Sequence, residues 1–98
     1  MRILLVEDEP EMADNIGTAL RRHDILLDHA SNLEIAREAV LGGLHDAILL
    51  DRKLPDGDGL SLLASLRKLE CNVPIIVISA LGSSPDRIAG LNGGADDY

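Results

Sequence analysis

The chain has 98 residues, which is enough for one small domain but not for two. Seventeen acidic residues against nine basic ones give a formal net charge of −8, so this segment is a poor candidate for binding nucleic acid or an anionic membrane. The single cysteine excludes an internal disulfide bond, and no apolar run is long enough for a membrane span or an export signal. We therefore expect a globular domain in the cytoplasm.

Four short apolar runs divide the sequence. The first, third and fourth are continuously apolar, which is typical of strands that are buried on both faces of a parallel sheet. In chain order the predicted strands are Ile3–Val6, Ile25–Ala30, Ala47–Leu50 and Pro74–Ile78.

Apolar residues with helical spacing fill the intervals between these runs. The expected buried faces are Met12, Ile16, Ala19 and Leu20 in the first interval, Ala36, Val40 and Leu41 in the second, and Leu62, Leu63, Leu66 and Leu69 in the third. A fourth helix is predicted to begin at Ser84, a capping residue followed by Pro85 at the first helical position. The alternation predicts an α/β fold with a doubly wound parallel sheet and right-handed crossovers.

Acidic and hydroxyl side chains follow three of the predicted strands. In chain order these residues are Glu7, Asp8 and Glu9 after the first strand, Asp51 after the third, and Ser79 and Ala80 after the fourth. Ligands of open α/β sheets bind beyond the carboxyl ends of the strands. We therefore expect these residues to converge at one edge of the sheet.

Carboxylates gathered at one edge repel one another, which raises their pKa values or attracts a cation. Mg²⁺ takes oxygen ligands and commonly uses one or two carboxylates together with phosphate oxygens. A metal-bound Asp51 could attack phosphorus to form an acyl phosphate, with the Ser79 hydroxyl and the Ala80 N–H holding phosphoryl oxygens. Each acid taken alone is equally an ordinary turn or helix-start residue. Their shared edge favours a functional site.

Four short segments carry a resemblance to a known family. VEDE follows the first strand, LLDRKLPDGDG spans the end of the third, ISA ends the fourth, and GADDY closes the sequence. In this order and spacing they resemble the receiver domain of bacterial two-component response regulators. GADDY resembles the OmpR/PhoB-like branch, whose effector domain is a winged helix. The resemblance runs from Ile3 to Tyr98.

This resemblance implies a flavodoxin-like (CheY-like) sheet with strand order 2-1-3-4-5. Residues 1–98 would form a receiver domain that is incomplete at its C-terminus, with the fifth strand, the fifth helix and the effector domain missing. The implied function is a signalling phosphoacceptor that takes a phosphoryl group from a sensor histidine kinase with the help of Mg²⁺. It would catalyse its own phosphorylation and dephosphorylation, and would switch a DNA-binding output.

The resemblance also implies roles for individual residues. Asp51 would accept the phosphoryl group from the kinase phosphohistidine or from a small donor such as acetyl phosphate. Asp8 and Asp51 would bind Mg²⁺ directly, Glu7 would bind it through water, and the third metal ligand would be the backbone carbonyl of Lys53. The expected switch residues are the hydroxyl of Ser79, the N–H of Ala80 and the aromatic ring of Tyr98.

One departure from the family pattern keeps other functions open. The lysine that contacts the phosphoryl oxygens would follow the switch aromatic, beyond Tyr98, so a receiver-like module used only for assembly is one alternative. Another is a phosphohydrolase of the haloacid dehalogenase type, although Lys53 stands where that class needs a second aspartate. A chain that ends here would expose its fourth strand as an edge, which predicts a dimer or a swapped oligomer.

The remaining polar residues suggest no second site. Asp56 and Asp58 fail the spacing of a calcium-binding loop and are interpreted as solvated turn residues. Three scattered histidines lack the spacing of metal ligands and are interpreted as surface or edge residues; they are His23, His29 and His45. In the turn before the predicted third helix, Pro55 restricts φ, and Gly59 gives the backbone more conformational freedom.

Overall fold

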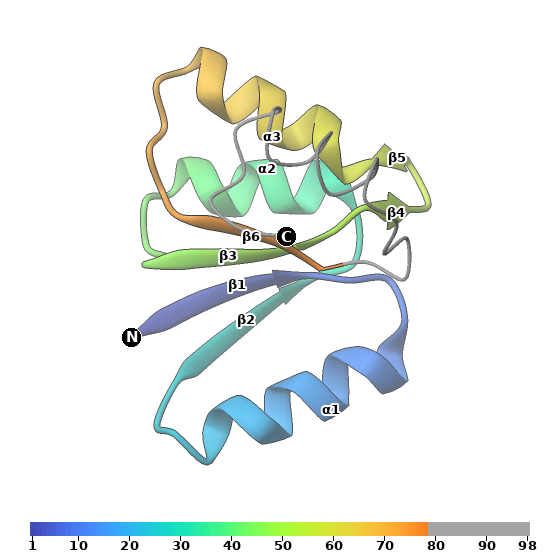
Figure 1. Cartoon of the computed structure of the whole chain (residues 1–98), viewed down its shortest axis with the longest axis vertical. Helices are drawn as coiled ribbons and strands as arrows, with labels where there is room; N and C mark the ends of the chain where they lie inside the picture. The colour runs from blue at the N-terminus through green and yellow to red at the C-terminus, as the bar shows by residue number, and fades with distance from the viewer. Residues whose placement is uncertain (79–98) are drawn as a thin grey trace.

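The computed structural model of the chain describes residues 1–78 (Figure 1). The elements in chain order are β1 Arg2–Val6, α1 Pro10–Arg21, β2 Leu26–Ala30, α2 Leu33–Leu41, β3 Ala47–Asp51, β4 Lys53–Leu54, β5 Gly57–Asp58, α3 Gly59–Lys68 and β6 Ile75–Ile78. The predicted fourth helix and the predicted site residues Ser79, Ala80 and Tyr98 lie outside the described residues. No helix within residues 1–78 has the length and apolar character needed to cross a membrane.

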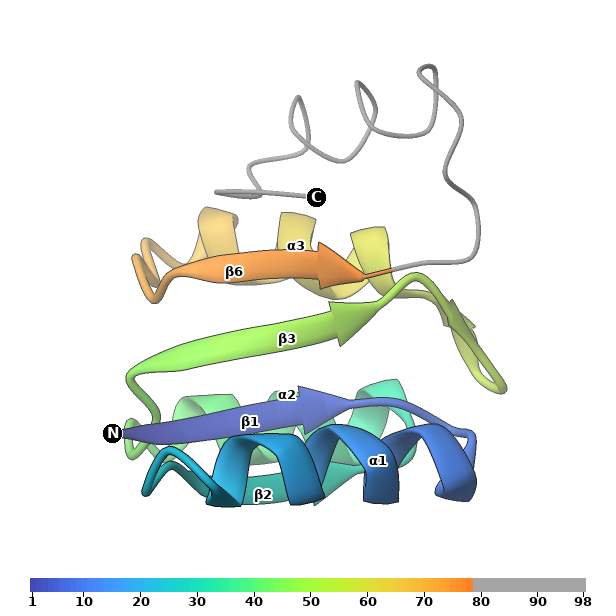
Figure 2. The ribbon, with the colours of Figure 1, turned by 60° about the horizontal axis from the view of Figure 1, so that its bottom comes forward.

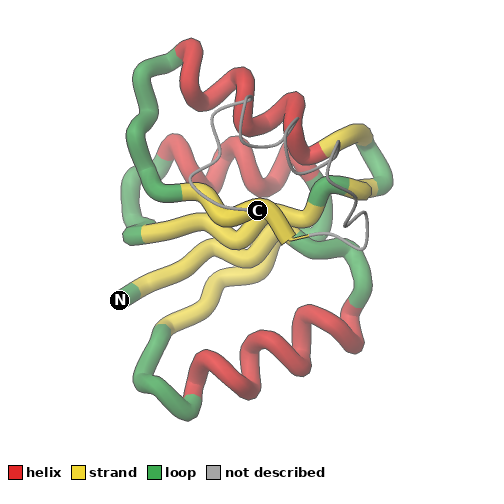
Figure 3. The backbone as a smooth tube through the Cα atoms, in the orientation of Figure 1, coloured by secondary structure: helices red, strands yellow, loops and turns green. Residues whose placement is uncertain are grey.

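The main sheet has the order β2-β1-β3-β6, and every neighbouring pair in it is parallel. Helix α1 covers one face, whereas α2 and α3 cover the other, and the four arrows point the same way (Figures 1 and 2). The doubly wound α/β fold is thereby confirmed, with the order 2-1-3-4 for the strands that the sequence predicts. The tube in Figure 3 shows the same layering of strands between helices.

The core is built almost entirely from aliphatic side chains. Leu4, Ile48 and Leu50 in the central strands are at most 1% exposed, and they pack with the fully buried Leu62 and Leu66 of α3. Burying one such leucine side chain contributes about 2 kcal/mol. Strand β1 is covered on both faces, as the sequence predicts, whereas buried and half-buried residues alternate in β3, and Ile76 of β6 is exposed.

The predicted helix faces need correction at several positions. Helix α1 packs through Ala13 and Gly17, whereas Met12 is 46% exposed and Ala19 is also exposed. Small residues allow the helix to approach the sheet closely, since a Cβ on Gly17 would lie 3.2 Å from Leu27 Cδ2. In α2 and α3 the predicted Leu41 and Leu69 are more than 60% exposed because they lie at the helix ends, and Leu33 is buried instead.

The two aspartates of the turn are capping residues rather than free turn residues. Asp58 is the N-cap of α3, and its Oδ1 accepts a hydrogen bond from Leu60 N at 3.0 Å. Asp56 accepts hydrogen bonds from the first turn of α2. Both side chains are exposed, as expected for solvated turn residues, but each also caps a helix. The Asp58 contact is local, whereas the Asp56 contact joins residues more than 20 positions apart and cannot be predicted from the turn composition.

A charged cluster ties β1 and β2 to the loop before β3. Asp28 Oδ2 accepts a hydrogen bond from Arg2 Nε at 2.6 Å and another from His45 Nε2 at 2.7 Å. The His45 side chain is only 5% exposed, so it is not a surface residue as expected. The bond from Arg2, followed by that from His45, lowers the pKa of Asp28 to about 2.

We expect Asp28→Asn to remove a pH-dependent part of the stability. Because the folded-state pKa is depressed, ionised Asp28 stabilises the fold above its unfolded pKa of about 3.9, and this stabilisation is lost as the pH falls towards 2. With 38% of the side chain exposed, solvent screening limits the effect to about 1 kcal/mol. Urea unfolding at pH 7 and pH 3 measures it. The exposed Asp14→Asn is the control, and an equal loss in both variants would contradict the prediction.

Candidate functional site

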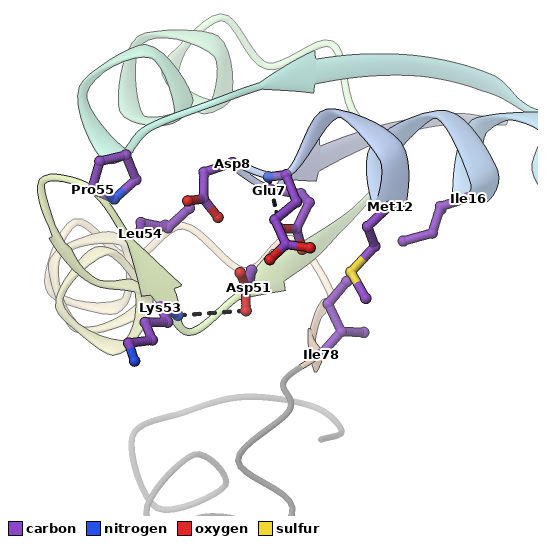
Figure 4. Close-up of a pocket in the computed structure, with 10 residues that line it drawn as sticks. Glu7, Asp8, Met12, Ile16, Asp51, Lys53, Leu54, Pro55 and Ile78 are labelled. Carbon is purple, nitrogen blue, oxygen red and sulfur yellow. Dashed lines mark hydrogen bonds between the residues drawn. The ribbon is translucent and has the colours of Figure 1, made fainter.

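Three carboxylates meet where β1 and β3 end. One oxygen each from Glu7, Asp8 and Asp51 lies within 4.8 Å of the others. Glu7 is 2% exposed, Asp51 is half-buried and Asp8 is exposed, so the cluster runs from the interior to the surface. Figure 4 shows the three side chains directed towards one another. The expected convergence of the two acidic segments is therefore found in the structure.

The β-sheet and the start of α1 hold Glu7 rigidly. Its backbone N donates to the Ala30 carbonyl at 3.0 Å, and its carbonyl accepts from His29 Nε2 at 2.6 Å. Its Oε1 accepts from the backbone N of Glu9 at 3.1 Å. Glu9 is itself the N-cap position of α1 and lies outside the cluster of three. Strand β2 thus holds the backbone of Glu7, and the start of α1 orients its carboxylate.

The segment after β3 holds Asp51 through its backbone. Lys53 N donates to Asp51 Oδ1 at 3.4 Å, and Gly59 N donates to the Arg52 carbonyl at 2.6 Å. A Cβ on Gly59 would overlap the backbone oxygen of Asp51. This close approach, rather than a left-handed backbone, is the reason that glycine stands at position 59, which refines the expectation made for it.

Burial and like charge act together on these carboxyl groups. Burial raises the pKa of Glu7, and the nearby Asp51 and Asp8 raise it further. Burial is also the main reason that the pKa of Asp51 is raised, with an additional contribution from Asp8. The metal-free cluster therefore tends to retain a proton, and a cation placed among the carboxylates would favour their ionised form.

The carboxylates open into a cavity of about 730 Å³. One part of its wall is acidic, and another is apolar where α1 faces the end of β6 (Figure 4). The lining residues are Glu7, Asp8, Glu9, Met12, Ile16, Asp51, Lys53, Leu54, Pro55 and Ile78. The space accommodates a hydrated ion together with a small charged group. The all-oxygen donor set fits Mg²⁺, which prefers hard oxygen ligands and retains water.

Two residues near the site were missed in the sequence. His29 bonds the Glu7 carbonyl through a protonated Nε2, because a carbonyl can only accept. The sequence carries no signal for this bond, which depends on the register of β2 with β1, where His29 lies opposite Leu5. The exposed Met12 was assigned to the core, although it lies on the cavity wall.

Comparison with known protein families assigns this chain to a family. Residues 3–98 match the model of the response regulator receiver domain. The chain belongs to this family. All 98 residues of this receiver chain align with the transcriptional regulatory protein TcrA of Mycobacterium tuberculosis, at 44% identity. The chain spans less than half the length of these curated relatives, with 39% of TcrA and 44% of BasR of Escherichia coli.

Solved structures agree with this assignment. The BeF3-activated N-terminal receiver domain of Klebsiella pneumoniae RstA is 34% identical, with a TM-score of 0.94 over 100% of this chain and 83% of that chain. A Burkholderia pseudomallei response regulator that holds a phosphorylated aspartic acid and a calcium ion is 26% identical. Its TM-score is 0.88 over 99% of this chain and 57% of that chain. The fold is that of response regulator receiver domains, and the curated relatives are transcriptional regulators.

Proposed function

We propose that Asp51 accepts a phosphoryl group from a sensor histidine kinase in a reaction that requires Mg²⁺. The observation that carries the proposal is the cluster of three carboxylates, in which half-buried Asp51 faces Glu7 and Asp8 at the carboxyl ends of the central strands. A phosphorylated aspartic acid in the Burkholderia relative supports the same chemistry here.

The chain's own residues would hold the metal in a specific way. Asp8 and Asp51 would bind Mg²⁺ directly, Glu7 would act through water, and the backbone carbonyl of Lys53 would complete the protein ligands. When bound, Mg²⁺ neutralises the repulsion between carboxylates and phosphoryl oxygens. Burial of Glu7 supports this role, because a buried acid with a raised pKa gains from a nearby cation.

The transfer itself is a displacement at phosphorus. An Asp51 carboxylate oxygen forms a bond to phosphorus as the bond from phosphorus to the kinase histidine breaks, and the imidazole leaves with the bonding electron pair. The Ser79 hydroxyl and the Ala80 N–H hold phosphoryl oxygens, and Tyr98 turns with Ser79 when Asp51 is phosphorylated. The receiver thereby catalyses its own phosphorylation. Attack of water on the acyl phosphate then releases inorganic phosphate and restores the Asp51 carboxylate.

The output of this switch lies outside residues 1–98. The curated relatives are transcriptional regulators more than twice as long as this chain, which supports a DNA-binding effector domain as the output. The chain's net charge of −8 also argues against direct DNA contact by the receiver itself. A cytoplasmic location follows from the same proposal, because sensor kinases present their phosphohistidine there.

We further propose that the receiver self-associates as a dimer, which could form by exchange of an element between copies. The apolar side chain of Ile76 on β6 is 37% exposed. Exposed apolar side chains on a strand favour association with a second copy. Light scattering over a range of concentrations tests this, and a monomer throughout would contradict it.

The phosphorylation proposal is tested by intact-mass analysis after incubation with acetyl phosphate. We expect one added phosphoryl group in the presence of Mg²⁺ and none after chelation.

Asp8→Asn should lower the Mg²⁺ affinity by about tenfold or more, because it removes a charged ligand. Glu9→Gln is the matched control, since it removes the same charge from the same cavity but lies outside the carboxylate cluster. Equal Mg²⁺ affinities in Asp8→Asn and Glu9→Gln would show that Mg²⁺ is attracted by the general negative charge of the cavity and not bound by Asp8.

A further inference from the structure

The short β4–β5 hairpin connects the phosphorylation site to α3. It begins two residues after Asp51 and ends at Asp58, immediately before α3. Its ladder consists of the pairs Lys53↔Asp58 and Leu54↔Gly57, with Pro55 and Asp56 forming the turn. A hairpin this short is not stable on its own, so its position depends on what it contacts.

The turn residue Asp56 reaches the N-terminus of α2. Its Oδ1 accepts from Leu33 N at 2.9 Å, and its Oδ2 lies 3.3 Å from Glu34 N, which donates to it. Asn32 Oδ1 accepts from Ile35 N at 2.9 Å. The first three N–H groups of the helix, which have no partner within the helix, are therefore all bonded. Two of the three are bonded by a residue more than 20 positions away.

Charge and packing strengthen this contact. The positive end of the helix dipole favours a carboxylate at this place, and the bond from Leu33 is the main reason that the pKa of Asp56 is lowered. Beneath it, Leu33 and Leu54 are less than 10% exposed and belong to the same core cluster. Gly57 has φ of +147° and lies so close that a Cβ would be 3.2 Å from Leu33 Cδ1.

We propose that Asp56 is a positioning residue for the phosphorylation site. By bonding the start of α2, its carboxylate holds the hairpin in place, and the hairpin in turn fixes the backbone of Lys53 beside Asp51. The effect on metal binding rests on the proposed function, because it acts through the Lys53 carbonyl as a Mg²⁺ ligand. The anchoring of the hairpin rests on the hydrogen bonds alone.

Variants on both sides of the contact separate positioning from other effects. Asp56→Asn keeps one acceptor oxygen but loses the charge, and Asp56→Ala loses both acceptors. Glu34→Gln removes an equal charge from the same helix turn and leaves the N–H groups bonded to Asp56. Asn32→Ala removes the other cap of α2 without touching the hairpin. The two controls therefore match the loss of charge and the loss of helix stability.

Two measurements on the same variants are needed. Amide hydrogen exchange should speed up at residues 53–59 in Asp56→Asn and more strongly in Asp56→Ala, including at the Gly59 N–H that bonds the Arg52 carbonyl. Calorimetric titration with Mg²⁺ alone should show affinity lower by about three- to tenfold, since groups that orient metal ligands have effects of this order. Both controls should leave hairpin exchange and Mg²⁺ affinity near the parent values.

Each outcome decides the matter. Unchanged hairpin exchange in both Asp56 variants would overturn the proposal. If the Asp56 variants show faster hairpin exchange but bind Mg²⁺ with the same affinity as Glu34→Gln, the link between the hairpin and the metal site is overturned. Loss of charge alone would then explain any change in affinity. If the parent itself binds no Mg²⁺, the proposed function fails, and hairpin exchange alone then supports or overturns the anchoring by Asp56.

Discussion

Asp51→Asn is expected to abolish phosphoryl transfer to the receiver while making the metal-free fold more stable. The amide oxygen of asparagine is a poor nucleophile, so no acyl phosphate forms and intact-mass analysis should show no added phosphoryl group. The amide still accepts from Lys53 N, which bonds Asp51 Oδ1 in the parent. The hairpin should therefore keep its position.

The gain in stability follows from the raised pKa of Asp51. A carboxyl group whose folded-state pKa is raised stabilises the fold below its unfolded pKa, and this contribution is lost as the pH rises through the folded-state pKa. At neutral pH, ionised Asp51 is therefore unfavourable beside Glu7 and Asp8. The asparagine variant should unfold with a free energy higher by on the order of 1 kcal/mol, or about 5 °C in Tm.

The pH dependence and the response to Mg²⁺ check this explanation. The difference in Tm between Asp51→Asn and the parent should shrink as the pH falls below 4, where the parent carboxyl is protonated. Addition of Mg²⁺ at pH 7 should raise the Tm of the parent more than that of the variant, because the ion binds the folded parent more tightly. Lower stability of the variant at pH 7 without metal would contradict the prediction.

Gly59→Ala is expected to cost about 3 kcal/mol of stability and to disturb the carboxylate cluster. The new Cβ would overlap the Asp51 backbone oxygen and would lie 3.2 Å from Arg52 Cα. These neighbours are backbone atoms, which cannot rotate away as a side chain could. The end of β3 must shift, and with it the carboxylate of Asp51. Urea unfolding and Mg²⁺ titration measure the two effects.

Gly17→Ala is the matched control for this substitution. Gly17 is buried in α1, but its added Cβ would meet the side-chain atom Leu27 Cδ2 at 3.2 Å, and that side chain can adjust. Alanine also favours the helix by about 1 kcal/mol relative to glycine. We therefore expect little change in stability for Gly17→Ala. A parent-like urea midpoint for Gly59→Ala would show that the backbone around Asp51 yields more easily than the structure indicates.

The periodicity of apolar residues carries enough information for the layers of the fold. Continuous runs predict strands covered on both faces, and this holds for Ile3–Val6 in β1, whereas β3 and β6 are more covered on one face than on the other. Because parallel strands end at one edge, the sequence also predicts that Glu7, Asp8 and Asp51 converge, as they do. This part of the site is predictable because strand ends are local features.

Contacts between distant segments were decided by the tertiary structure alone. Nothing in the turn after β3 indicates that Asp56 would cap α2, because that bond depends on how the hairpin folds back over the sheet. The hydrogen bond between Asp28 and His45 is equally invisible in the sequence, because it joins β2 to the loop before β3. Helix α1 buries Ala13 rather than Met12 because its rotation is set by close approach to the sheet. Sequence patterns encode periodicity within an element, whereas the packing of elements against one another determines which residues touch.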